Sequence, residues 1–151
     1  MANTQALCTS FKTEILDGIH ALGTTVIRAG TGADTLKAAL YLTSATVNAA
    51  TTAYSATGEV TGSGYSAGGI TATNANQPAN SGTTAYWTPS ASFTYTNVTL
   101  TTAFDAVLIY NSTQSNKAIS VHTFGSQTVT AGTFVLSMPT SDASTGLLRI
   151  A

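Results

Sequence analysis

The chain has 151 residues, a length that fits one domain able to bury a core, and its formal net charge is −1. Only 7% of the residues are charged, against ~25% in ordinary soluble domains. This balance excludes the basic surface that binding to nucleic acid or to an acidic membrane requires, and a single cysteine, Cys8, excludes an internal disulfide framework. We therefore predict one domain, residues 1–151, that binds neither nucleic acid nor a membrane.

The charges are also unevenly distributed along the chain. From Val60 to Phe104 no residue carries a formal charge, and threonine, serine, alanine and glycine fill the stretch. Threonine alone makes up about a fifth of the chain, far above ordinary usage. Such a surface repels little and is weakly hydrated, which suits packing against other protein in an assembly. The alternative is a low-charge composition without functional meaning.

The first predicted element is an α-helix over residues 10–22, opened by a capping serine and ended by Gly23. Phe11, Ile15 and Ile19 recur at helical spacing and form an apolar stripe. The stripe has two interpretations. The helix packs on the sheet of its own domain, or it docks on a neighbouring subunit.

A long segment, about residues 43–82, follows a predicted strand at 36–42, and within it we expect only short strands, around Val60 and around residues 69–73. Its glycines are scattered among small and polar residues, so the segment cannot build a core by itself. A connection of this length inside a small domain is usually functional or ordered by a partner. We predict that it forms the working surface and that Glu59 and Tyr65 contact the partner.

Alternation of apolar residues places the centre of the core in one hairpin, with arms at 103–110 and 117–124. Further short strands are predicted at 84–88, 92–100, 133–138 and 147–150. About seven or eight short strands separated by turn residues are typical of an antiparallel sandwich or a jelly roll. We therefore predict an all-β fold, an antiparallel β-sandwich or jelly-roll-like barrel with one N-terminal α-helix.

Residues that carry chemistry are few and scattered. The two histidines, His20 and His122, are far apart, and no Gly-x-Ser-x-Gly nucleophile elbow occurs. One cysteine and two distant histidines give no ligand cluster at zinc spacing, and no Asp-rich calcium loop is present. Gly62-Ser-Gly64 begins a partial dinucleotide fingerprint, but no helix pattern follows it. The sequence predicts no enzyme and no catalytic, cofactor or metal site.

Several motifs along nearly the whole chain carry a further signal. They are Leu7-Cys-Thr-Ser-Phe-Lys-Thr-Glu-Ile-Leu, Leu36-Lys-Ala-Ala-Leu-Tyr-Leu-Thr-Ser-Ala, Thr52-Ala-Tyr, Gly58-Glu-Val-Thr-Gly-Ser-Gly-Tyr-Ser-Ala-Gly-Gly69, Leu108-Ile-Tyr-Asn-Ser, Phe124-Gly-Ser and Leu148-Arg-Ile-Ala151. In this order they resemble a group of small virion structural proteins of tailed bacteriophages, of the capsid decoration or cement type.

The resemblance implies a β-sandwich that coats the capsid exterior as a dimer or trimer and stabilises the shell by bridging major capsid proteins. Its partners would be the major capsid protein and other copies of the chain. It would lie on the capsid surface of the virion, and in the host cytoplasm during assembly. The expected contact residues are Phe11, Ile15, Ile19, Glu59 and Tyr65.

Two other functions fit the same sequence. The first is a tail, fibre or baseplate component, which the same composition would suit. The second is a carbohydrate-binding module for host adhesion, in which Tyr54, Tyr65, Tyr86 and Trp87 would stack on sugar rings. Core filling is the alternative use of these aromatic side chains.

Overall fold

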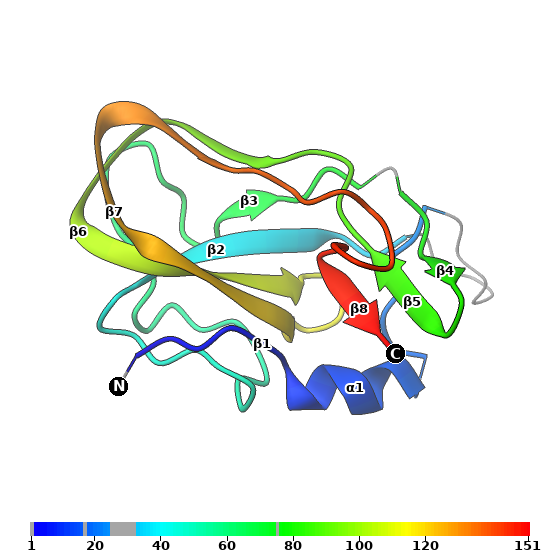
Figure 1. The fold of residues 1–151 in the computed structure, drawn as a ribbon. Coiled ribbons are helices and arrows are strands. Elements are labelled where there is room, and N and C mark those ends of the chain that lie inside the picture. The colour runs from blue at the N-terminus through cyan, green and yellow to red at the C-terminus, as the bar shows by residue number, and fades with distance from the viewer. Residues whose placement is uncertain (1, 17, 25–32, 75) are drawn as a thin grey trace.

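A computed structural model of the chain describes residues 2–16, 18–24, 33–74 and 76–151 (Figure 1). Within these ranges the strands form two antiparallel sheets. The larger has the strand order β1 (Ala6–Leu7), β7 (Lys117–Leu136), β6 (Phe93–Asn111), β2 (Leu36–Leu42) and β3 (Ile70–Thr71). The smaller sheet has the order β4 (Ala79–Ser81), β5 (Thr84–Trp87) and β8 (Leu148–Ile150). For the described residues, the predicted all-β, sandwich-like fold with one N-terminal helix is confirmed.

The hairpin of β6 and β7 organises the larger sheet. Its pairing runs from Asn111 opposite Lys117, beside the turn, to Phe93 opposite Leu136 at the far end. The strands predicted separately at 92–100 and 133–138 are continuous with the arms of the predicted hairpin. Several register shifts interrupt the ladder, and positive φ angles at Asn97 (53°) and Ala131 (46°) lie in the same region. The sequence therefore predicted the strands but divided each arm in two.

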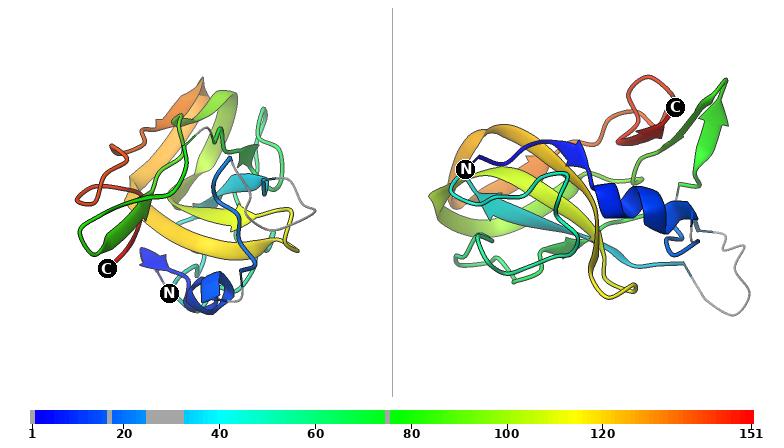
Figure 2. Two further views of the ribbon diagram at one scale, coloured as in Figure 1. Left: turned by 90° about the vertical axis from the view of Figure 1, so that its right-hand side faces the viewer. Right: turned by 90° about the horizontal axis from the view of Figure 1, so that it is seen from below.

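The hairpin bends back over itself, so that its two halves form opposing layers (Figures 1 and 2). The Tyr95 hydroxyl, in the far half of β6, donates a 2.8 Å hydrogen bond to the carbonyl of Ala38 in β2. The rings of Phe104 and Phe134 meet edge to face with centroids 5.0 Å apart. These contacts place the core between the layers.

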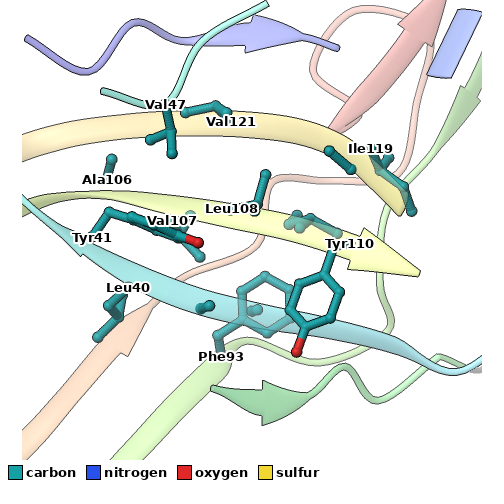
Figure 3. Close-up of a cluster of buried hydrophobic side chains, with 14 of the residues drawn as sticks. Leu40, Tyr41, Val47, Phe93, Ala106, Val107, Leu108, Tyr110, Ile119 and Val121 are labelled. Atoms are coloured by element: carbon teal, nitrogen blue, oxygen red, sulfur yellow. The ribbon is translucent and has the colours of Figure 1, made fainter. Parts of the chain in front are cut away.

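Residues of β2, β6 and β7 fill much of this core (Figure 3). β6 lies between β7 and β2 in the sheet, as the apolar alternation on both its faces predicted. The largest fully buried side chains of the described residues are Trp87, Tyr41, Phe11, Phe93, Phe104, Leu36, Leu40, Leu100, Leu108, Ile109, Ile119 and Val98. Burial of this many large apolar groups supplies the main driving force for folding.

The long connection after β2 packs on the sheet of its own chain. Val47 and Val60 are buried in the core. A Cβ atom at Gly62 would lie 2.0 Å from the carbonyl oxygen of Thr99, and one at Gly69 would lie 1.8 Å from that of Ala38. Glycine is therefore required at both positions because the connection's backbone touches the backbone of β6 and β2. The sheet itself thus provides the order that we expected from a partner.

The N-terminal helix α1 (Thr9–Leu16) is shorter than the predicted 10–22. Gly18 has a φ of +69°, its amide donates to the carbonyl of Ile15, and the amide of Ile19 donates to the carbonyl of Glu14. These two bonds form a Schellman motif, which ends a helix at a glycine in the left-handed conformation. Gly18 and not Gly23 is therefore the stop.

Candidate interaction surface

The five predicted contact residues do not form one exposed patch. Phe11 is fully buried, on the side of α1 that packs against β7, and Glu59 is 6% exposed. Ile15, Ile19 and Tyr65 are partly buried. The helix therefore uses Phe11 to pack on its own domain, the first of the two interpretations of its apolar stripe. Glu59 lies inside the protein, where a partner cannot reach its carboxylate.

Glu59 instead accepts three hydrogen bonds that hold the long connection in place. The hydroxyls of Tyr54 and Tyr65 donate to its carboxylate at 2.6 Å and 2.7 Å, and the amide of Gly68 donates at 2.8 Å. The Tyr65 hydroxyl also accepts the amide hydrogen of Leu40 in β2. Burial, reinforced by the hydrogen bonds to Glu59, raises the pKa of both tyrosines. Both therefore stay neutral and donate to the carboxylate.

A second buried cluster joins α1 to the hairpin. Glu14 accepts from Lys117 Nζ at 2.6 Å and from His20 Nε2 at 2.7 Å. His20 Nδ1 lies 3.0 Å from Asn111 Nδ2, which also donates to Asp34 at 2.8 Å. Burial alone raises the pKa of Glu14, but the hydrogen bonds from Lys117 and His20 outweigh it and hold that pKa below its ordinary value.

Both ring nitrogens of His20 have hydrogen-bond partners in this cluster. Its side chain is 0% exposed, and an amide donor at Nδ1 leaves the proton on Nε2, which faces Glu14. A catalytic histidine needs a ring nitrogen free to take a proton from a nucleophile. With both nitrogens occupied, the cluster fastens α1 to the sheet. Asp17, which the sequence placed near His20, lies outside the described residues.

A groove of about 610 Å³ lies between β1 and β7 on one side and the C-terminal segment around β8 on the other. On its wall, Ser120 Oγ and His122 Nε2 lie 3.0 Å apart. Burial lowers the pKa of His122 to about 4, so its imidazole is neutral at pH 7 but a weak base. None of the described residues that line the groove is an aspartate or glutamate, so the pair lacks the carboxylate that orients a catalytic histidine.

The aromatic residues proposed for sugar stacking are mostly turned inward. Trp87 is 1% exposed, and its indole nitrogen donates to the carbonyl of Asn76. Tyr54 and Tyr65 are held by Glu59, and Tyr86 is partly buried. Stacking on a sugar ring requires an open aromatic face. Core filling is therefore the use that the structure shows for Trp87.

The far half of the hairpin, residues 93–104 and 123–136, forms the surface with the most distinctive chemistry. No residue in it carries a formal charge, and the whole stretch 118–141 is free of Asp, Glu, Lys and Arg. Thr94, Thr96, Thr133 and Val135 are exposed on its outer face, opposite the buried Phe93. We call residues 93–104 and 123–136 the uncharged layer.

Val135 is the exposed apolar residue of the uncharged layer. It is 48% exposed, and among the described residues the other exposed large hydrophobic is Ile150, at 45%. Sequence reasoning missed Val135, because it noted the absence of charge from Val60 to Phe104 and not the matching absence on β7. Pairing of β6 with β7 brings the two uncharged stretches together.

Metal binding, membrane crossing and likeness to known proteins were the other possible indications of function. Among the described residues, no group of three or more histidine, cysteine, aspartate or glutamate side chains could hold a metal ion. Within the same ranges, no helix has the length and apolar character that a membrane crossing needs. No protein-family model, curated protein or solved structure matches the chain.

Proposed function

We propose that the chain is a structural protein of a tailed-bacteriophage virion, which decorates the capsid exterior and stabilises the shell by bridging major capsid proteins. The observation that supports this proposal is the uncharged layer. Threonine and valine side chains can be buried against another protein without removing an ion from water, which costs several kcal/mol per ion. A surface of this kind suits permanent contact with other protein better than contact with solvent.

The placement of the charged groups supports the same proposal. Of the charged side chains that the structure describes, Glu14 and Lys117 fasten α1 to β7, and Glu59 fastens the long connection. Asp105 accepts a hydrogen bond from Asn3 at 2.6 Å, which holds the N-terminal segment. These charges act within the subunit. They hold segments of the subunit to one another, and the uncharged layer is left for assembly.

The mechanism that we propose is distributed burial. Each copy would bury about 1,000 Å² against its neighbours, near the lower limit for a specific interface. Repetition of such a contact by the symmetry of the capsid multiplies its effect, because partners already held in place meet at high effective concentration. The subunit would stiffen the shell through many modest contacts, without a cofactor and without catalysis.

Cryo-electron microscopy of particles of the encoding phage tests the proposal directly. We expect density for this fold in hundreds of copies on the outside of the head, and heads that lack the protein should recover it when purified protein is added. Density confined to the tail, fibre or baseplate would overturn the proposal in favour of a tail component. Absence from the particle together with specific binding on a glycan array would overturn it in favour of adhesion.

A further inference from the structure

We propose that two copies of this chain associate edge to edge through β7, with their strands antiparallel about a two-fold axis that passes beside Val135. The inference deepens the proposed function, because it names one partner and the residues that meet it. It concerns the isolated protein, so its test does not depend on whether the protein binds capsids.

The outer edge of β7 is open along most of its length. β1 pairs with β7 at two positions, Ala6 with Val121 and Leu7 with Ser120. From His122 to Leu136, no strand among the described residues pairs with β7 on the side away from β6. Such an edge presents unpaired backbone donors and acceptors, and an added strand satisfies them.

Soluble proteins protect open edges with charged side chains, prolines or bulges. The open edge of β7 has no formal charge, and the first proline after it, Pro139, lies beyond the end of the strand. Register shifts disturb the middle of the strand, but Phe134, Val135 and Leu136 pair with β6 in consecutive register. This regular end of the edge is the part best able to accept another strand.

The chemistry of this regular end fits a second copy of itself. In an isologous contact both copies use the same surface. A charged residue near the two-fold axis would therefore face the same charge on the second copy. Residues 133–137 carry no formal charge. Val135 is β-branched and 48% exposed, and cross-strand pairs of β-branched residues stabilise antiparallel sheets.

The alternation of faces selects the register. Val135 and Thr133 point to the outer face, whereas Phe134 and Leu136 are partly buried. Residues that pair across two strands point to the same face of the sheet. Outer-face residues of one copy must therefore pair with outer-face residues of the other, because a shift of one residue would turn the core-facing side chains of one copy to the outer face. An axis beside Val135 meets this condition. It sets Val135 opposite Val135 of the second copy, Thr133 opposite Ser137, and Phe134 opposite Leu136.

The contact is small. A strand edge of this length buries much less than the ~1,200 Å² of a stable standard interface. We therefore expect a dimer that dissociates on dilution in free solution and becomes persistent where neighbouring copies are held close together.

Disulfide trapping provides a decisive test. Opposed residues of antiparallel strands have Cα atoms about 4.5–5.5 Å apart, within the ~4.4–6.8 Å that a disulfide spans. Val135→Cys should therefore form a disulfide-linked dimer under mild oxidation. Thr94→Cys is the matched control, because Thr94 is exposed on the same face and pairs directly with Val135, but on β6. Its two copies would be about 14 Å apart at the usual strand spacing. The native Cys8 is fully buried in both variants.

Light scattering and sedimentation of the unmodified protein complete the test. We expect a concentration-dependent rise from the chain mass of 15.3 kDa towards twice that value. Val135→Lys should weaken the dimer at least about tenfold, because like charges would meet at the axis, while Thr94→Lys should leave it intact. A protein that stays monomeric or forms a trimer, a dimer that Val135→Lys leaves unchanged, or equal cross-linking of both cysteine variants would each overturn the inference.

Discussion

The carboxylate of Glu59 and the hydroxyl of Tyr65 lie 2.7 Å apart, and this contact closes the long connection onto the sheet. Tyr65 also connects the segment to β2, because its hydroxyl accepts the amide hydrogen of Leu40 at 3.0 Å. A segment rich in glycine and threonine thereby gains order from one buried acid. Glu59 is a structural centre of the fold, and substitutions there should act on stability.

Replacing Glu59 with alanine should destabilise the protein by about 3 kcal/mol, because two tyrosine hydroxyls and the amide of Gly68 lose their acceptor. Glu59→Gln keeps one carbonyl oxygen and should cost about 1 kcal/mol. Glu59→Lys should be at least as harmful as alanine, since it buries an ammonium against hydrogen-bond donors. Urea unfolding measures the differences. Thr57→Ala, an exposed change in the same connection, is the control; equal effects at Thr57 and Glu59 would contradict the assignment.

Glu14 and His122 predict a stepwise loss of stability in acid. The folded protein lowers the pKa of His122 to about 4, so between about pH 6.5 and 4 the unfolded chain binds the proton more readily and acidification favours unfolding. The pKa of Glu14 is also lowered, from an ordinary 4.5. Its contribution is present above that pH and is lost as the pH falls through the folded value.

Urea midpoints at pH 7, 5 and 3.5 separate the two contributions. His122→Gln should lose less stability than the wild type between pH 7 and 5, and Glu14→Gln should flatten the curve below pH 4.5. If both variants follow the wild-type profile at every pH, these groups do not control acid sensitivity.

Two glycines with positive φ distinguish a crowded position from an open one. A Cβ atom at Gly82 (φ +57°) would have no neighbour within 4 Å, whereas one at Gly69 (φ +68°) would lie 1.8 Å from the carbonyl oxygen of Ala38. Gly82→Ala should cost about 1 kcal/mol, for the left-handed backbone alone. Gly69→Ala should cost several kcal/mol more, because the connection must move off β2. Thermal unfolding checks the order; similar melting temperatures would refute the close approach.

Phe11→Ala should destabilise the protein by about 3–4 kcal/mol, the usual cost of removing a fully buried ring. Lys12→Ala, its exposed neighbour on α1, should change stability by less than about 0.5 kcal/mol. Chemical denaturation measures both. A harmless Phe11 substitution would revive the alternative in which the apolar stripe of the helix serves a neighbouring subunit.

The sequence predicted the arm at 103–110 because apolar residues on both faces mark a strand inside a sheet. It predicted the strand at 36–42 from the alternation of its side chains between two faces. It could not predict that each arm of the hairpin is continuous. Asn97 and Ala131 adopt positive φ without being glycine, so no glycine marks these two positions as part of the bend. The helix was predicted too long because Gly18 was not read as its stop, although a glycine after an apolar stripe is the usual signal.

The candidate contact residues were harder to predict than the fold. Glu59 is the single charge within a long uncharged region, which favoured an exposed position, since isolated acids are rarely buried. Its partners Tyr54 and Tyr65 are near in sequence, but their convergence on one carboxylate depends on the path of the connection over β2. The place of Val135 in an uncharged surface could have been predicted from the charge-free stretch on β7 only if the pairing of β7 with β6 had been known.

The bent hairpin also leads to an expectation about the order of folding. Asn111 and Lys117 can meet as soon as a short turn forms, whereas Phe93 reaches Leu136 only after the whole ladder is in place. Closing distant pairs last is slow, and proteins dominated by such pairs fold in about milliseconds to seconds. We therefore expect the far end of the β7 edge to form after the pairs beside the turn. In the dimer that we propose, each copy would then offer an edge that is already paired with its own β6.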